Sequence, residues 1–172
     1  DIKAYASRDG FATAGTQIQL ANQGTIESVA ANQGGIDANT VLMLHMDGAY
    51  DGTTFTDSAL TPKTVTRVGD PVTRTNVKKF GTASGYFDGS GDYLTLVDSE
   101  DWNFGSADFT FDWWVNMASM GNFIHIGQRE AAFGWEILTS GSNLHFWTPN
   151  GSFGADPAGS LGDISNTWTH LA

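Results

Sequence analysis

The sequence lacks several features that would point to common functions. It contains no cysteine, which excludes disulfide bonds, thiolate catalysis and zinc held by cysteine. Only 8 residues are Lys or Arg against 19 Asp or Glu, so the formal net charge is -11, whereas a nucleic-acid-binding surface needs clustered Lys and Arg. Every apolar run is far shorter than the roughly 20 residues that a membrane-spanning helix requires. We therefore expect neither nucleic acid nor a membrane span.

What the sequence does contain is enough apolar material for one buried core. Of its 172 residues, 40% are hydrophobic and 12% are aromatic, which suits a single domain of ordinary size. The character of the chain changes near residue 40. Residues 1–40 predict an extended β arm, because apolar and polar side chains alternate on both sides of a turn at Asp9-Gly10. Residues 41–172 predict one β domain.

Short apolar runs, separated by clusters of Gly, Asn, Asp and Ser, fill residues 41–172. Each predicts a strand, at residues 41–46, 63–69, 84–89, 92–97, 108–117, 121–128, 133–139, 142–148 and 167–172. None shows the period of a helix. Several strands spaced about ten residues apart are typical of an all-β antiparallel sandwich or jelly roll. The last strand stops without a turn or cap, so we expect this sandwich to be incomplete at its C-terminus, with its sheets completed by more chain or by partner chains.

The strand at 108–117 has the clearest alternation in the chain. Phe109, Phe111, Trp113 and Val115 share one face, and Thr110, Asp112 and Trp114 share the other. The aromatic face is the predicted core. For the other face, and for the strands that follow, a second use of aromatic rings is open, because sugars stack on exposed Trp rings. The candidate platforms for a glycan are Trp114, Trp135 and Trp147, with burial in the core as the alternative for each.

The stretch GYFDGSGDYLTL at 85–96 lies between the predicted strands 84–89 and 92–97, which we expect to pair, and it supports two interpretations. In the first, it is only the hairpin turn of that pair. Asp88 and Asp92 can each bond to backbone amides of a tight glycine-rich reversal, which is reason enough for both. Alternatively they hold calcium, which takes six to eight oxygen ligands and would need further carboxylates from another loop. The candidates for that second loop are Asp47, Asp51 and Asp57. The sequence leaves both interpretations open.

Catalytic patterns are missing from the sequence. A glycosidase needs two carboxylates that face one cleft, but Glu100 and Asp101 are adjacent, Asp112 stands alone, and Glu136 has apolar neighbours. The four histidines lie in separate apolar strands without the close pairing of a zinc site. We therefore predict that the chain is not an enzyme.

Three stretches in order resemble a known family: VLMLHMDGAYDGTTFTDSA, FGTASGYFDGSGDYLTLVDSEDWNFGSADFTFDWWV and WTHLA. In laminin-G-like and concanavalin A-like jelly rolls, a strand ending in Asp-Gly precedes a Phe-Asp-Gly-x-x-Asp-Tyr turn, and an aromatic strand and a Trp-x-His strand follow. The resemblance covers residues 41–172 and implies that this jelly-roll domain is partial. It also implies structural calcium in some relatives. The fold carries lectins, accessory modules and virion proteins alike, so it does not select a function.

The arm carries a second resemblance. Its DIKAYASRDGFATAGTQIQLANQG is similar to strand segments found beside such jelly rolls in bacteriophage tail and fibre proteins. The two resemblances together imply a non-enzymatic virion structural or adhesion module, such as a tail fibre, spike or capsid decoration. Its expected partners are other virion subunits in an oligomeric assembly and a cell-surface glycan. The alternative is a secreted carbohydrate-binding accessory domain of a glycoside hydrolase.

Overall fold

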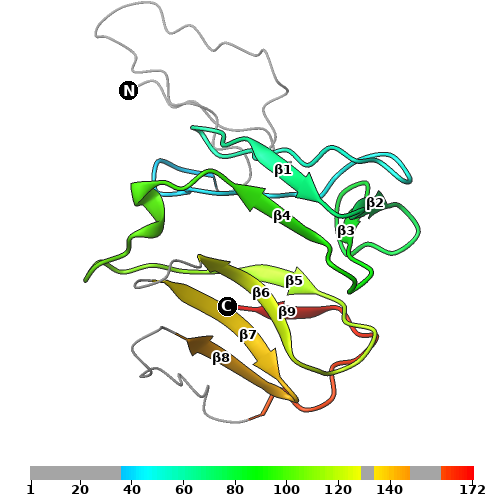
Figure 1. The fold of residues 1–172 in the computed structure, drawn as a ribbon. Coiled ribbons are helices and arrows are strands. Elements are labelled where there is room, and N and C mark those ends of the chain that lie inside the picture. The colour runs from blue at the N-terminus through cyan, green and yellow to red at the C-terminus, as the bar shows by residue number, and fades with distance from the viewer. Residues whose placement is uncertain (1–35, 129–133, 148–159) are drawn as a thin grey trace, which may run out of the picture.

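A computed structural model describes residues 36–128, 134–147 and 160–172 of the chain. This part is all-β, as the sequence predicts, with short strands and a single turn of 3-10 helix, η1, at Glu100–Trp102 (Figure 1). The strands are β1 Val65–Val68, β2 Val72–Arg74, β3 Ser84–Tyr86, β4 Tyr93–Leu96, β5 Trp113–Val115, β6 Phe123–Gln128, β7 Trp135–Ser140, β8 Asn143–Trp147 and β9 Thr169–Leu171.

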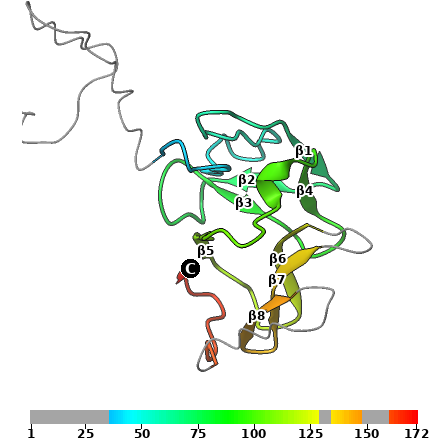
Figure 2. The ribbon, with the colours of Figure 1, turned by 90° about the vertical axis from the view of Figure 1, so that its left-hand side faces the viewer.

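The strands form small antiparallel sheets. These are the pairs β1–β4, β2–β3 and β5–β9, and the three-stranded sheet β6–β7–β8. Both ribbon views place β1 to β4 in one half of the molecule and β5 to β9 in the other (Figures 1 and 2). The finer expectation of a two-sheet sandwich stays a prediction.

The longest ladder is β6–β7–β8, and local sequence explains both of its connections. Gly141 has φ +59 in the two-residue link from β7 to β8, where a tight hairpin favours glycine. Its N–H donates to Asn122 Oδ1 over 3.2 Å. The β6–β7 register shifts between Ile124 and Ile126, so His125 is the extra residue of a β-bulge.

An aromatic cluster fills the space beside β7 and β8. Trp135 lies 4.8 Å from Phe111 and 5.1 Å from Phe104, measured between ring centroids. Phe109 lies 4.6 Å from Phe104 and 5.7 Å from Phe146 on β8. The predicted core face of the aromatic strand therefore joins this cluster at Phe109 and Phe111. Trp114, on the opposite face, is 38% exposed.

Most predicted strands are present, but the one at 41–46 is wrong. Leu44 there makes only an isolated bridge, to Asp57. The N–H of Met43 donates to the Asp57 carboxylate over 2.9 Å, and Met46 has φ +58. A side chain takes the donor that a ladder would need, and the left-handed backbone at Met46 ends any extended run.

The glycine-rich stretch at 85–96 is not a hairpin, although the strands beside it were expected as a pair. β3 pairs with β2, and β4 pairs with β1. The segment between β3 and β4 therefore carries the chain from one small sheet to the next. Most of the arm, residues 1–35, lies outside the described residues. Residues 149–151, where the sequence Pro-Asn-Gly predicts a turn, also lie outside them.

Within the described ranges, we find no helix of the length and apolar character that crossing a membrane requires.

Candidate functional site

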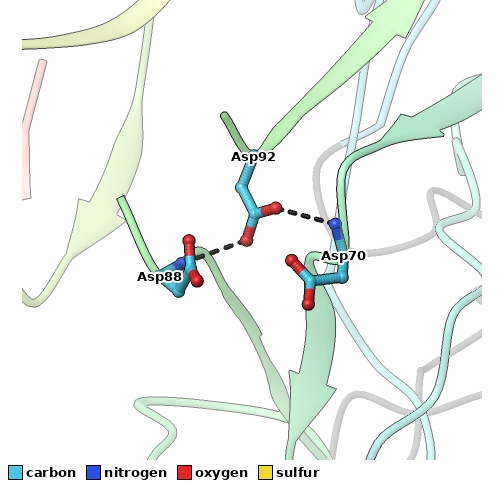
Figure 3. A group of neighbouring side chains, drawn as sticks. All are labelled: Asp70, Asp88 and Asp92. Carbon is cyan, nitrogen blue, oxygen red and sulfur yellow. Dashed lines mark hydrogen bonds between the residues drawn. The ribbon is translucent and has the colours of Figure 1, made fainter. Parts of the chain in front are cut away.

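Three aspartates gather where β1, β3 and β4 meet (Figure 3). Asp70 follows β1, Asp88 follows β3, and Asp92 precedes β4. One oxygen can be chosen from each carboxylate so that all three lie within 4.8 Å of one another. Asp92 is the centre of the group, because its Oδ1 accepts the Asp70 N–H over 2.8 Å and its Oδ2 accepts the Asp88 N–H over 3.1 Å.

The position of Asp92 between the other two aspartates determines the electrostatics of the cluster. Partial burial opposes ionisation of Asp92, but the N–H groups of Asp88 and Asp70 outweigh it and leave the pKa of Asp92 lowered. The hydrogen bond and the charge of Asp92, with the charge of Asp88, raise the pKa of Asp70. The three carboxylates therefore repel one another, which a cation between them would relieve.

The same geometry also serves the turn without a metal. Asp88 Oδ1 accepts the Ser90 N–H over 2.7 Å, and Gly89 and Gly91 have φ +84 and +81. These are the local bonds and left-handed positions expected of a glycine-rich reversal. Asp88 and Asp92 thus brace a turn, and with Asp70 they offer oxygen ligands of the kind calcium prefers.

Asp70 was not among the candidate ligands from the sequence. The structure brings it in because Val68 pairs with Tyr93 in the β1–β4 ladder, which places the residues just beyond them side by side. The signal in the sequence was the strand VTRVGD ending in Gly-Asp. Recognising it required knowing that β1 pairs with β4.

The other three candidate ligands lie outside this cluster. The carboxylate of Asp47 accepts the N–H and the hydroxyl of Thr82. Asp51 forms an ion pair with Arg74. Asp57 is 3% exposed and accepts three backbone N–H groups, those of Met43, Ala59 and Lys63, over 2.8 to 3.0 Å. Each of the three holds a loop in place.

The three candidate tryptophans differ in exposure. Trp135 is 8% exposed and packs in the aromatic cluster, with its Nε1 donating to the Trp102 carbonyl over 3.2 Å. A ring buried in this way cannot stack on a sugar. Trp114 and Trp147 are 38% and 41% exposed, so a ligand can reach both.

Trp114 on β5 is the centre of an exposed cluster. Its ring stacks on His170 of β9 at 5.2 Å, and Phe80 meets it edge-on at 5.4 Å. Lys79 Nζ lies 4.5 Å from the Trp114 ring centroid, a cation–π distance. His170 Nε2 in turn lies 2.9 Å from Asp112 Oδ1. The predicted sharing of one face by Asp112 and Trp114 is confirmed by their common contact with His170.

Trp147 lies at the end of β8, opposite Glu136 of β7. Strand alternation places Glu136, His145 and Trp147 on the same face of the sheet. Gly127 lies on the other side of Glu136, and a Cβ there would come within 3.0 Å of Glu136 Cγ. On this face the Trp147 indole is exposed, whereas Glu136 is only 4% exposed.

Comparison with protein families, with curated proteins and with solved structures found no match for this chain.

Proposed function

We propose that the chain is a non-enzymatic structural and adhesion module, a β-sandwich of the laminin-G or concanavalin A type. The observation that carries this proposal is the amount of aromatic surface left open to solvent. Nine aromatic side chains among the described residues are exposed: Tyr50, Phe80, Tyr86, Phe87, Tyr93, Phe109, Trp114, Phe123 and Trp147. Two of these side chains, Phe80 and Trp114, meet in one exposed cluster, and contiguous exposed apolar surface marks sites that contact other molecules.

The arrangement of the carboxylates supports a role without catalysis. Asp47, Asp57 and Asp92 accept backbone N–H groups, and Asp51 and Asp101 form ion pairs with Arg74 and Lys63. Carboxylates engaged in this way brace loops and are poor general acids or bases. The module presents surface and does not transform a substrate.

The most concrete form of the proposal is a virion component, such as a tail fibre, spike or capsid decoration. The arm docks on a neighbouring subunit, and the β domain faces outward to a host glycan. The support is the sequence of the arm together with the exposed aromatic rings. Calcium at Asp70, Asp88 and Asp92 would be structural in this role.

Two measurements on the purified chain test the proposal. Antibodies raised against it should label the surface of assembled virions in electron microscopy. A panel of oligosaccharides should show binding without release of new reducing ends. Hydrolysis of any glycan, or the absence of label from virions, would contradict it.

The second candidate function is a carbohydrate-binding accessory domain of a secreted glycoside hydrolase. The observation in its favour is the exposed Trp147, which shares its face of the sheet with His145 two residues before it. Co-sedimentation with insoluble polysaccharide tests it. Trp147→Ala should abolish co-sedimentation and Trp114→Ala should preserve it. Retention of Trp147→Ala in the pellet would reject this candidate.

A further inference from the structure

Two exposed tyrosines contact one arginine of β2. The Arg74 Cζ atom lies 4.8 Å from the ring centroid of Tyr50 and 5.2 Å from that of Tyr86, both cation–π distances. Tyr50 is 56% exposed and Tyr86 is 48% exposed. Because the guanidinium contacts both rings, the two tyrosines belong to one surface.

Strand register and an ion pair complete this surface. Val72 of β2 pairs with Tyr86 of β3, so Arg74, two residues after Val72, shares a face of the sheet with Tyr86. The carboxylate of Asp51 forms an ion pair with Arg74. The Asp51 side chain is 59% exposed and the Arg74 side chain 26%, so solvent reaches both. We call Tyr50, Asp51, Arg74 and Tyr86 the tyrosine platform.

The loop that carries Tyr50 and Asp51 is fixed to β2 by hydrogen bonds. The Asp51 N–H donates to the Thr73 carbonyl over 2.9 Å, and the Thr73 N–H donates to the Gly52 carbonyl over 2.8 Å. Thr73 Oγ1, in a fully buried side chain, donates to the Ala49 carbonyl over 2.6 Å. Asp51 has φ +60, a left-handed conformation that is uncommon outside glycine and that these bonds hold. A loop held in this way loses little conformational entropy when a ligand binds.

We propose that the tyrosine platform binds a neutral oligosaccharide. Sugars stack their apolar faces on aromatic rings, and their hydroxyl groups both donate and accept hydrogen bonds. The platform offers the matching groups, since its two tyrosine rings lie beside a carboxylate that accepts and a guanidinium that donates. The inference rests on the proposed adhesion function and assigns its glycan to particular residues.

The ion pair within the platform favours a neutral sugar over an acidic one. Asp51 already balances the charge of Arg74, so a sulfate or uronic acid bound here would meet an exposed carboxylate of like charge. A sugar hydroxyl carries no charge and can bond to either member of the pair. The two ring centroids are no farther apart than the sum of their distances from Arg74 Cζ. One short oligosaccharide can therefore contact both rings.

The platform is more open to a sugar than Trp114 is. The Trp114 ring stacks on His170, meets Phe80 edge-on and has Lys79 Nζ 4.5 Å from its centroid. Tyr50 and Tyr86 are each more exposed than Trp114. More of their surface is therefore left for stacking.

Isothermal titration calorimetry of the full chain tests the inference. The probes are maltotriose, cellotriose, mannotriose, xylotriose and galactotriose, with trigalacturonate as the acidic probe. At least one neutral trisaccharide should bind, and more tightly than trigalacturonate does. Its affinity should be the same at low salt and in about 1 M salt, where the Debye length is about 3 Å, because a neutral ligand is not held by charge. Tyr50→Ala and Tyr86→Ala should each lower the affinity by about tenfold or more, as truncation of a hot-spot aromatic does.

Tyr93→Ala is the matched control, since Tyr93 is 53% exposed and lies on β4, in a different sheet. It should bind the same trisaccharide as the unmodified chain does. Tyr50→Phe should also retain binding, because the ring that stacks remains. Circular dichroism should show that every variant is folded.

The inference is overturned if none of the neutral trisaccharides binds, or if trigalacturonate binds more tightly than all of them. It is also overturned if Tyr50→Ala and Tyr86→Ala bind as the unmodified chain does, or if they abolish association between copies of the chain instead of sugar binding. Sugar binding that survives both substitutions would place the glycan elsewhere and leave the proposed function intact. A chain that binds no sugar but labels virions would likewise overturn only this inference.

Discussion

The backbone N–H of Asp70 donates to Asp92 Oδ1 over 2.8 Å, across 22 residues of sequence. The bond lies at the open end of the β1–β4 ladder, where Val68 pairs with Tyr93. A side chain thus takes over where the backbone ladder stops. Because the second oxygen of Asp92 accepts the Asp88 N–H, one carboxylate joins the ends of β1 and β3 to the start of β4.

Calcium should stabilise the chain through this cluster. A calcium ion coordinated by Asp70, Asp88 and Asp92 would relieve the repulsion among their carboxylates. A ligand that binds only the folded state raises the melting temperature. Asp70→Asn should abolish the calcium effect while leaving the metal-free melting temperature unchanged or higher, because the substitution removes one of the repelling charges. Thermal melts with calcium or with chelator measure both.

Asp108→Asn is the control for this prediction, since Asp108 is exposed and lies outside the cluster. It should keep the calcium response. If calcium changes no melting temperature, Asp88 and Asp92 only brace their turn, which is the other interpretation of the sequence.

Asp57 should be the carboxylate whose loss costs the most stability. Its burial opposes ionisation, but the N–H groups of Met43, Lys63 and Ala59 outweigh it and leave the pKa of Asp57 lowered. Asp57→Ala leaves three backbone N–H donors without their acceptor, and each donor that stays buried and unpaired costs about 1–3 kcal/mol. Because water reaches some of these donors in the variant, we expect the free energy of unfolding to fall by about 2–4 kcal/mol. Asp57→Asn should cost less, because one acceptor oxygen remains.

The dependence of the free energy of unfolding on pH in the acid range also tests the role of Asp57. A folded-state pKa below the unfolded value of about 3.9 gives stability that is complete above that value and lost as the pH falls through the folded pKa. Urea denaturation should therefore show a steeper loss below about pH 4 for the unmodified chain than for Asp57→Asn. Parallel pH curves for the two proteins would contradict this assignment.

His125 should make stability fall on mild acidification. Burial lowers the pKa of His125, and its Nε2 is buried without a hydrogen-bond partner in the described structure. Above the unfolded value of about 6.5 both states are neutral, and below it the unfolded chain takes up a proton that the folded chain resists. Stability should then drop by up to about 1.4 kcal/mol per pH unit until the folded pKa is reached.

Denaturation curves between neutral pH and pH 5 measure this effect. His125→Phe should flatten the pH dependence, because a phenyl ring fills the place beside Trp113, 5.7 Å away, and cannot be protonated. An unchanged slope in His125→Phe would mean that another group titrates.

Local patterns in the sequence predicted most of the strands but not their partners. The alternation around Phe111 and Trp114 separated the two faces, because side-chain direction in a strand depends only on position. Phe109, on the predicted core face, is nevertheless 48% exposed. Pairing depends on contacts distant in sequence, so the reversal at Asp88 looked like a hairpin although its two strands belong to different sheets. The run at 41–46 was apolar enough for a strand, but the Asp57 side chain takes its backbone donor.

In the candidate site, too, the sequence predicted the residues that are close in the chain but not those that strand pairing brings together. Asp88 and Asp92 were found because they are close in sequence. Asp70 was missed because only the β1–β4 register brings it there. Asp57 was a plausible ligand by residue type, whereas its actual partners are backbone N–H groups, which leave no mark in a sequence. Trp135 and Trp147 could not be separated by pattern, since exposure is decided by what packs on each ring.

Of the glycines beside the aspartate cluster, Gly69 should be the one whose substitution destabilises the fold most. It has φ +77, and a Cβ would lie 2.4 Å from Asp92 Oδ1 and 2.9 Å from the Gly91 carbonyl oxygen. Gly69→Ala therefore combines the backbone strain of the left-handed region, about 1–2 kcal/mol, with displacement of the carboxylate that joins β1, β3 and β4. Gly89→Ala is its matched control, because φ is +84 there and a Cβ would meet open space.

Urea denaturation of these two variants separates the two effects. Gly89→Ala should lose only the strain, whereas Gly69→Ala should lose more and should also lose any response to calcium. Since both positions have nearly the same φ, the difference between their free energies of unfolding reports the contribution of Asp92 in its observed position. Equal losses in the two variants would mean that the Asp70–Asp92 bond contributes nothing measurable to the fold.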